Sequence, residues 1–467
     1  MKNHEAHGIN AKELYHLFAK NPDLKPEGLS KSRYSLFKFV SEMIKSSRAS
    51  YPISILVRVI VKIQWIAVLC IPYTIYLDKK NINRPRFLQF LNLVLYLSQD
   101  PFNEKYITVS PFLLFLLSVL IISFFLYGYM KAYNNLNFTR FQSSAFHFVC
   151  CDVLSLVLLV YASSTGIVMN FTLLGQESYL MQSIMMMCTL GSLIYIQYLL
   201  NSTIYASQQY MHGFECGYSK SVQTQIPFVV VTVFMTIVSP LMSIEHARIV
   251  HLLMMLVFGI FFMFQALSFQ YIHSLAIVIY ESLGMNCLVV AIFEFFQNAT
   301  FYQNGSFVIH SIVGSFFVFF FLFRFLYSYQ FRRVAQTFDS NSISEIESSH
   351  QFIKYLRFGF ESGADQVING TFCMDHYAKF INYFVSCVVL RYTSLFHNEP
   401  DYINILFKSL PISSNRSLFF DFVIYEHNKL KSFRSKTRMS AVANEMAEYT
   451  KRSIDGFASM ASIYSSF

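Results

Sequence analysis

The sequence SFVIHSIVGSFFVFFFLFRFLYSYQFRR, residues Ser306–Arg333, is an almost unbroken run of aromatic and aliphatic side chains. A helix of roughly 20 apolar residues is long enough to cross the hydrocarbon core of a bilayer. The run closes on Arg324, Arg332 and Arg333, and charged residues become frequent after it. We therefore predict that the chain before this point is embedded in a membrane, and that most of the chain after it is a water-facing helical region.

The amino-acid composition is typical of a membrane protein. Hydrophobic residues make up 54% of the 467 residues and charged residues only 13%, whereas soluble domains carry roughly 25% charged residues. The 51 Phe and 30 Tyr, against one Trp, suit lipid-facing and interfacial helices. The net charge of +9 arises largely before residue 90 and after residue 320. Charge in those places flanks apolar segments, so it does not indicate nucleic-acid binding.

Eight apolar segments predict an all-α fold, a polytopic transmembrane helix bundle of about eight spans. They are Ile53–Leu77, Ile107–Tyr127, Ala145–Met169, Ser183–Tyr205, Ile226–Ser243, Ile249–Gln270, Ile272–Gln297 and Ser306–Ser328. Pro72 is expected to kink the first segment, because proline removes a helical hydrogen bond.

The charges of the loops predict the orientation of the bundle, because cytosolic loops are enriched in Lys and Arg. With the N-terminus inside, the loops that carry Lys131, Arg140 and Lys220 are cytosolic. The first loop opposes this assignment, because it carries four basic residues between positions 79 and 86. An even number of crossings places both termini in the cytosol. We expect an integral membrane protein, in the plasma membrane.

Three asparagines are candidate glycosylation sites. The segments after Met169 and after Gln297 are predicted to be external, and neither carries Lys or Arg. They contain the acceptor pattern Asn-X-Ser/Thr at Asn170, Asn298 and Asn304.

The sequence predicts no cofactor, no metal site and no enzymatic activity. The eight Cys are scattered, and no C-x-x-C pattern occurs. His246 and His251 share a short segment without a third ligand nearby, so interfacial histidines are the simpler interpretation. Kinase, zincin, nucleophile-elbow and dinucleotide-binding motifs are absent from the sequence.

The chain divides into four predicted parts. Residues 1–50 form a basic cytosolic segment, and residues 51–330 form the transmembrane bundle. Residues 331–415 are predicted to form short cytosolic helices of about 12–18 residues, the size found in tetratricopeptide-like hairpins. Residues 416–467 are predicted to form a C-terminal coupling helix. The apolar stripe of its second half, Met446–Tyr464, suits packing on a partner helix or on its own domain.

Charged residues inside the predicted spans are the candidate functional residues, because a charge at the centre of a bilayer costs a few kcal/mol. Asp152, Glu281 and Arg324 all fall in the inner half of the bilayer. They predict an intramembrane polar cluster, with His147 as a further member, that acts as a proton- or ligand-linked switch. The alternatives are a structural set of paired charges, and an arginine that snorkels to the headgroups.

A resemblance to a known family appears in the cytosolic region. The run LRFGFESGADQVINGTFCMDHYAKF and the following VLRYTSLFHNEPDYINILF resemble the helical-repeat region of protist proteins related to tiny macrocysts protein B. The matching features are an R-x-GF entry at Arg357–Phe360 and an acidic-Pro break at Glu399-Pro400. Many members resemble receptor-type adenylyl or guanylyl cyclases. These 467 residues contain no cyclase-like metal-binding Asp pair, so the resemblance implies the sensing and coupling half without the catalytic half.

Two functional hypotheses follow. The first is a receptor-like or regulatory membrane protein that relays a change in the bundle to a cytosolic helical region. The resemblance implies a place in cyclic-nucleotide signalling, and the predicted partners are the bilayer and a protein bound through the C-terminal helix. The second is a transporter or channel that uses Asp152, Glu281 and Arg324. Internal repeats are typical of transporters, and the sequence shows none.

Overall fold

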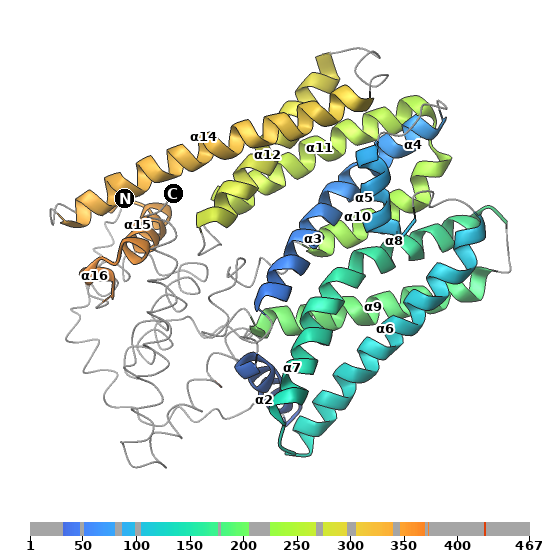
Figure 1. Cartoon of the computed structure of the whole chain (residues 1–467), viewed down its shortest axis with the longest axis horizontal. Coiled ribbons are helices and arrows are strands. Elements are labelled where there is room, and N and C mark those ends of the chain that lie inside the picture. The colour runs from blue at the N-terminus through green and yellow to red at the C-terminus, as the bar shows by residue number, and fades with distance from the viewer. Residues whose placement is uncertain are drawn as a thin grey trace, which may run out of the picture.

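A computed structural model describes residues 31–46, 51–79, 86–98, 104–175, 179–204, 225–267, 274–296, 305–339 and 346–368, together with Phe372 and Tyr425. Within these residues every regular element is a helix, which confirms the predicted all-α class (Figure 1). The predicted C-terminal coupling helix and most of the predicted short-helix region lie outside the described residues.

The apolar segments of the sequence coincide with helices. The described elements are α2 (Lys31–Ser46), α3 (Tyr51–Leu69), α4 (Ile71–Lys79), α5 (Arg86–Tyr96), α6 (Glu104–Tyr133), α7 (Arg140–His147), the π-helix η2 (Phe148–Val153), α8 (Leu154–Leu173), α9 (Leu180–Ile204), α10 (Gln225–Val238), the 3-10 turn η6 (Ser239–Leu241), α11 (Ile244–Leu267), α12 (Ser274–Phe296), α14 (Gly305–Asp339), α15 (Ser349–Ser362) and α16 (Asp365–Ile368). The first predicted span is broken at Cys70, two residues before Pro72, as the missing amide hydrogen of proline leads one to expect.

Five of the described helices are long and apolar enough to cross a membrane. Their apolar stretches are Ser110–Tyr133, Arg140–Leu173, Leu180–Leu200, Glu245–Phe264 and Ile312–Phe338. Three further apolar helical stretches are shorter, namely Val59–Leu69, Ile226–Leu241 and Ile277–Phe293. These dimensions are compatible with an integral membrane protein.

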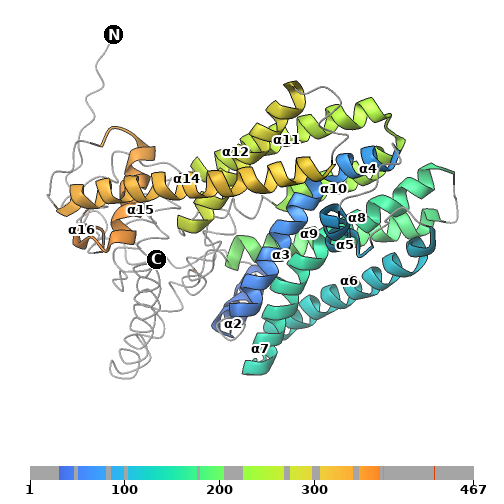
Figure 2. The same cartoon turned by 45° about the horizontal axis from the view of Figure 1, so that its top comes forward.

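The helices form two groups that meet at α3. In one group α8 packs against α6, α9 and α10, and α2 packs against α6 and α7. In the other group α12 lies between α11 and α14. Helix α3 contacts α8 and α10 on one side and α11 on the other, and its continuation α4 packs on α11 (Figures 1 and 2).

The single tryptophan lies where these groups meet. Trp65 of α3 is stacked on Phe228 of α10, with ring centroids 4.5 Å apart, and on Phe262 of α11 at 6.2 Å. Tyr280 of α12 lies 6.2 Å from the same indole ring. Aromatic side chains provide large apolar area and prefer such offset contacts. This aromatic core therefore joins α3, α10, α11 and α12.

Two helix pairs approach closely at glycines. A Cβ atom on Gly166 of α8 would lie 2.7 Å from Cβ of Thr236 and 3.0 Å from the carbonyl oxygen of Val233, both on the α10 side. A Cβ atom on Gly284 of α12 would lie 3.0 Å from the carbonyl oxygen of Gly259 in α11. Small residues allow helix backbones to pack closely, which is common where helices associate in a membrane.

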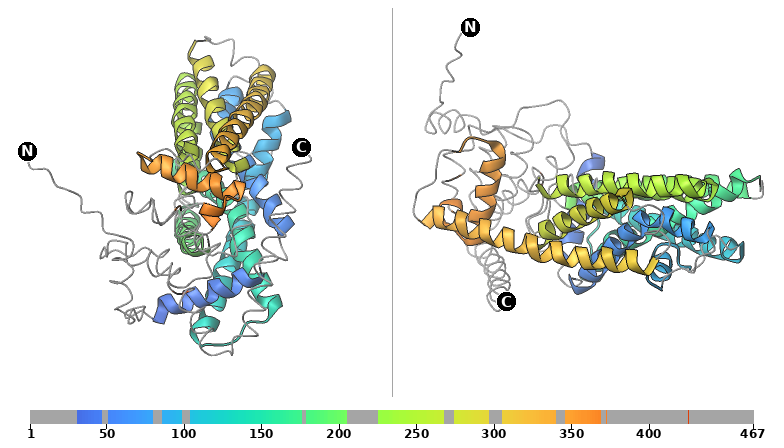
Figure 3. Two further views of the ribbon diagram at one scale, coloured as in Figure 1. Left: turned by 90° about the vertical axis from the view of Figure 1, so that its left-hand side faces the viewer. Right: turned by 90° about the horizontal axis from the view of Figure 1, so that it is seen from above.

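Helix α14 is much longer than a membrane crossing. At ~1.5 Å per residue its 35 residues extend about 52 Å, whereas the hydrocarbon core of a bilayer is about 30 Å thick. The predicted domain boundary at residue 330 falls inside this unbroken helix. The C-terminal part of α14 carries α15 and α16 at its side, beyond the end of α12 (Figures 1 and 3).

Candidate functional site

Helix α15 is attached to α14 by aromatic side chains. Phe358 of α15 packs edge-on against Tyr327 of α14 at 5.2 Å between ring centroids, and against Phe331 at 6.1 Å. Further along α14, Phe338 contacts Tyr355 at 6.0 Å. A Cβ atom on Gly359 would lie 2.8 Å from the ring of Phe338, so glycine permits this close approach. Every one of these contacts lies between α15 and the C-terminal half of α14.

A buried arginine lies at the centre of this attachment. The side chain of Arg357, on α15, is 1% exposed. Its guanidinium donates a hydrogen bond of 2.8 Å to the hydroxyl oxygen of Tyr327, and the same hydroxyl donates to a carboxylate oxygen of Glu361 at 2.5 Å. Hydrogen bonds to charged groups are about twice as strong as those between neutral groups. Tyr327 therefore connects a cation and an anion of α15 to α14.

The same arginine acts on the membrane bundle. The charge of Arg357 interacts favourably with the carboxylate of Glu281, which lies on α12 and is itself partly buried. Charges interact more strongly where water is excluded. Arg357 thus binds α14 directly, through the hydroxyl of Tyr327, and its charge also contributes to the electrostatic field at Glu281 on α12.

The neighbour of Glu281 faces a different helix. The hydroxyl of Tyr280 accepts a hydrogen bond of 2.5 Å from the ammonium of Lys62 on α3. The same ammonium lies 3.3 Å from the ring centroid of Trp65, within the range of cation–π attraction. Successive residues of α12 are therefore coupled to α3 on one side and to α15 on the other. We call Lys62, Tyr280, Glu281, Arg357 and Tyr327 the junction.

An apolar cavity of about 240 Å³ adjoins the junction and is lined by residues of α3, α5, α11, α12 and α14. Its lining includes Lys62 and Trp65 from α3 and Phe316 from α14. Asn286 of α12 also lines it, and its amide nitrogen donates to the carbonyl oxygen of Ile312 at 2.8 Å. The hydroxyl of Ser315 donates to the amide oxygen of Asn286 at 2.8 Å. The side chain of Asn286 therefore holds α14 against α12 at the cavity wall.

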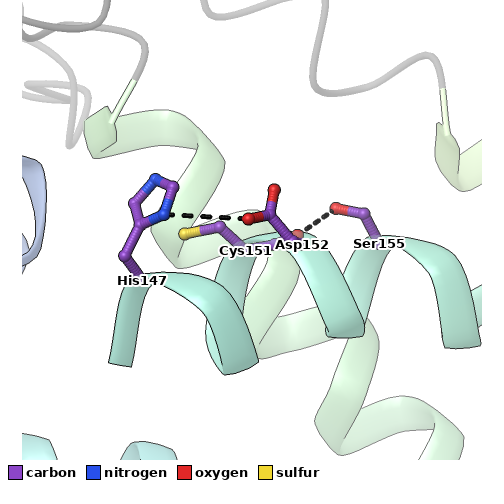
Figure 4. A network of polar contacts seen from close by, with 4 residues as sticks. All are labelled: His147, Cys151, Asp152 and Ser155. Carbon is purple, nitrogen blue, oxygen red and sulfur yellow. Dashed lines mark hydrogen bonds and ion pairs between the residues drawn. The ribbon is translucent and has the colours of Figure 1, made fainter. Parts of the chain in front are cut away.

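A second buried polar group lies in the other half of the molecule, on the π-helical segment η2 (Figure 4). Nδ1 of His147 lies 3.9 Å from a carboxylate oxygen of Asp152, and both side chains are buried. The hydroxyl of Ser155 donates to the carbonyl oxygen of Cys151 at 2.6 Å and accepts from the amide of Gln197 at 3.2 Å. π-Helical turns inside α-helices often occur at functional sites.

The structure places the predicted intramembrane charges on three separate helical segments. Asp152 lies on η2 beside His147, the further member that the sequence suggested. Glu281 lies on α12 in the field of Arg357. Arg324 lies on α14, where its carbonyl oxygen accepts from the hydroxyl of Ser328. None of the interactions described joins Asp152, Glu281 and Arg324 into one cluster, and that cluster stays a prediction.

Sequence reasoning missed most of the junction. Arg357 entered the sequence analysis only as part of the R-x-GF pattern, and Lys62 lies within the first apolar segment, Ile53–Leu77, without a pattern that marks it. Tyr327 and Tyr280 carry no signal in the sequence, because tyrosine is common throughout this chain. Their role depends on contacts between helices that are far apart along the chain.

The candidate glycosylation sites have different outcomes. Asn170 is buried in α8, and its amide nitrogen donates to the carbonyl oxygen of Ile237 at 2.6 Å. A glycan would be attached to that same nitrogen, so glycosylation would require this hydrogen bond to be absent, and glycosylation of Asn170 stays a prediction. Asn298 and Asn304 lie outside the described residues.

The remaining histidines singled out in the sequence contact neighbouring side chains. Nδ1 of His246 lies 2.5 Å from the hydroxyl of Ser243, and the ring of His251 is stacked on Tyr73 at 5.7 Å. Among the described residues, no three His, Cys, Asp or Glu side chains come together as metal ligands do. On α15, burial and the neighbouring positive charge of Arg333 lower the pKa of Lys354.

No protein-family model, no curated protein and no solved structure matches this chain.

Proposed function

We propose that this protein is a receptor-like or regulatory membrane protein that relays a conformational change of its helix bundle to a cytosolic helical region. The observation that carries the proposal is the burial of Arg357 where α15 meets α14, with its guanidinium hydrogen-bonded to the hydroxyl of Tyr327. A buried charge that is hydrogen-bonded to a neighbouring helix favours one relative arrangement of the two helices, because losing the partner is costly. A shift of α12 or α14 therefore changes the stability of α15 in its docked position.

Helix α14 is suited to carry such a change. It is a single helix that contacts Asn286 of α12 near its beginning and α15 near its end. A continuous helix transmits translation and rotation along its axis, and small helix shifts are a common form of switching transition. In this proposal α15 alternates between a docked state, with Arg357 on Tyr327, and a released state.

The finer features of the proposal come from the sequence. The bundle has about eight crossings with both termini in the cytosol, in the plasma membrane, and residues 331–415 continue as tetratricopeptide-like helices. The coupling helix 416–467 binds a protein partner. The resemblance to proteins related to tiny macrocysts protein B supports a role in cyclic-nucleotide signalling, without catalysis in these residues.

Hydrogen–deuterium exchange of the full chain in lipid nanodiscs tests the relay. In Arg357→Met the peptides that cover α15 should lose protection, because the hydroxyl of Tyr327 loses its cationic partner. Peptides of α8 should keep their protection, which shows that the bundle is still folded. Arg357→Lys, which retains a charge but not the planar guanidinium, should give an intermediate result. Unchanged exchange of α15 in Arg357→Met would overturn the proposal.

A transporter or channel is the second candidate, and the buried His147–Asp152 pair on a π-helical turn favours it. Buried carboxylate–histidine pairs are used in proton relays through membranes. Proton flux into liposomes that contain the protein is the direct measurement. The transporter hypothesis predicts that Asp152→Asn abolishes the flux. Flux that is equal in the variant, in the unaltered protein and in empty liposomes would rule it out.

A further inference from the structure

The cavity beside the junction has the chemistry of a lipid-binding site. Its lining is almost entirely apolar and aromatic, and among the described lining residues Lys62 alone is charged. An engineered apolar cavity of about 150 Å³ stays dry and binds small apolar molecules, and the cavity in this protein is larger, at about 240 Å³. A ligand that fills it must therefore have an apolar body.

The polar groups at the cavity wall indicate the chemistry of the ligand's head group. The ammonium of Lys62 contributes a positive charge to the lining. Trp65 lines the same cavity and is 2% exposed, and its indole N–H has no hydrogen-bond partner among the described residues. A buried tryptophan N–H usually finds an acceptor. An anionic group with several acceptor oxygens matches both donors, whereas the amide of Asn286 is already used by α14.

The position of the cavity indicates where the ligand comes from. Val313 and Phe317 of α14 line the cavity and are also 39% and 53% exposed on the surface of that helix. The exposed side of α14 is strongly apolar, and Phe321 and Phe325 continue it at 67% and 70% exposure. If α14 spans the membrane, as its length and hydropathy allow, this side faces lipid. A ligand dissolved in the bilayer then reaches the cavity past the side chains of α14.

We propose that this cavity binds a long-chain fatty acid, with its carboxylate on Lys62 and the indole N–H of Trp65 and its acyl chain along Phe316 and Cys287. The ammonium that binds the carboxylate is the same group that donates to Tyr280, the neighbour of Glu281. Where the proposed relay holds, this fatty acid is its signal, because pulling Lys62 toward the carboxylate changes the position of Tyr280 on α12. Binding itself does not depend on the relay.

Photocrosslinking tests the site. The full chain is purified into phosphatidylcholine nanodiscs and irradiated with a palmitic acid that carries a diazirine on its chain, and the labelled peptides are identified by mass spectrometry. Label should appear on α3, α12 and α14 at the residues that line the cavity. Palmitate should compete, and hexadecanol, which has the same chain without a charge, should compete at least about 10-fold less well, because it cannot form a charge-assisted hydrogen bond.

Variants separate recognition of the carboxylate from folding. Lys62→Met should weaken labelling about 10-fold, and Lys62→Arg should largely restore it, because a charged donor is retained. Lys131→Met is the matched control, since Lys131 lies on α6, outside the cavity, and donates to Gln142. The thermal midpoint of each variant shows whether it is folded. Labelling outside the cavity, or equal competition by palmitate and hexadecanol in the unaltered protein, would overturn the proposal.

The same samples separate this proposal from the relay. Saturating palmitate should change hydrogen exchange in α15 of the unaltered protein but not in Lys62→Met. Specific labelling without any change in the exchange of α15 would support the fatty-acid site and contradict the proposal that fatty-acid binding acts through the relay. Faster exchange of α15 in Arg357→Met without specific labelling of the cavity would support the relay and contradict the fatty-acid site.

Discussion

Helices α8 and α14 are both apolar, but α8 is surrounded by other helices whereas α14 lies at the surface of the described bundle. In the most apolar 18-residue part of the stretch that contains α8, 61% is buried, whereas in that of α14 only 6% is buried. Helix α8 carries small and hydroxyl-bearing residues such as Ser163, Thr165 and Gly166, all buried. Helix α14 carries a run of phenylalanines between positions 316 and 325, each of them exposed or only partly buried. Small residues let neighbouring helices pack closely, and large aromatic ones suit a helix surface that faces lipid.

The two helices also differ in how many neighbouring helices they contact, which affects how easily each can move. Helix α8 contacts α3, α5, α6, α9 and α10, so any displacement of it disturbs many neighbours. Helix α14 packs closely along α12 and, through the aromatic seam around Phe358, against α15, and it has few other neighbours among the described elements. A helix with few neighbours can shift together with them, whereas a central helix would disturb many contacts. We therefore place the static part of the protein at α8 and its adjustable part at α14.

The largest expected effect comes from closing the space at Gly166. In Gly166→Leu the new side chain meets Thr236 and the backbone of Val233, which cannot move away without separating α8 from α10. We expect a loss of about 3 kcal/mol in the free energy of unfolding, measured as a lower thermal midpoint in detergent. Gly314→Leu on α14 is the matched control, because nothing lies within 4 Å of the Cβ position there. Equal destabilisation by both variants would contradict the assignment of a static and an adjustable helix.

The difference in burial between α8 and α14 could not be predicted from the sequence. Apolar runs of about 20 residues locate helices well, because length and hydropathy are sufficient when the solvent is a bilayer. The same runs do not predict which helix is central. The last apolar segment was predicted to end at Ser328, because the hydropathy falls there, and no helix end was assigned. The helix that carries it continues to Asp339, since no proline or glycine follows Ser328 within it and Tyr355 of α15 packs on Phe338.

The candidate site was predictable only in part. Glu281 and Asp152 were found because a charge within an apolar span is conspicuous. Arg357 lies in a polar segment, where an arginine is ordinary, and its burial depends on the approach of α15 to Tyr327, 30 positions away in the chain. Contacts at such separations are set by helix packing, which a single sequence does not encode in any local pattern.

The second prediction concerns the hydroxyl group that joins α14 to α15. Tyr327→Phe keeps the ring that packs on Phe358 but removes the acceptor for Arg357 and the donor to Glu361. We expect the docking of α15 to weaken by about 2 kcal/mol, since a buried guanidinium loses a hydrogen bond. Hydrogen exchange of α15 measures the loss. Tyr329→Phe, at a side chain that is 60% exposed on the same helix, should leave the exchange unchanged. Equal exchange in both variants would mean that the hydroxyl does not hold α15.

A smaller effect is expected where α14 meets α12. Ser315→Ala removes the hydrogen bond to the amide oxygen of Asn286 and leaves that oxygen without this donor. The contact between α14 and α12 should weaken by about 1 kcal/mol, visible as faster exchange in the first half of α14. Ser328→Ala provides the comparison, because the hydroxyl of Ser328 bonds within its own helix, to the carbonyl oxygen of Arg324. If Ser328→Ala had the larger effect on α14, the role assigned to Asn286 would be wrong.

The smallest effect concerns like charges on the docked face of α15. Burial and the positive charge of Arg333 lower the pKa of Lys354, so docking disfavours the protonated amine. Below the lowered pKa the lysine is protonated in both states and this repulsion is fully present. The docked state should become more stable only as the pH rises through the lowered pKa toward the usual value of about 10.4. Lys354→Gln removes the repulsion at every pH and should strengthen docking by about 0.3 kcal/mol, because the side chain is only partly buried and its charge is screened by solvent.

Salt sharpens this last test. Added salt screens exposed charges, with a Debye length of about 3 Å at 1 M, so it should slow the exchange of α15 in the unaltered protein and have less effect in Lys354→Gln. It should do little to the bond between Arg357 and Tyr327, which is buried. The salt series therefore separates the repulsion between Lys354 and Arg333 from the hydrogen bond between Arg357 and Tyr327. Faster exchange of α15 in Lys354→Gln would show that Lys354 holds the helix in place rather than repelling it.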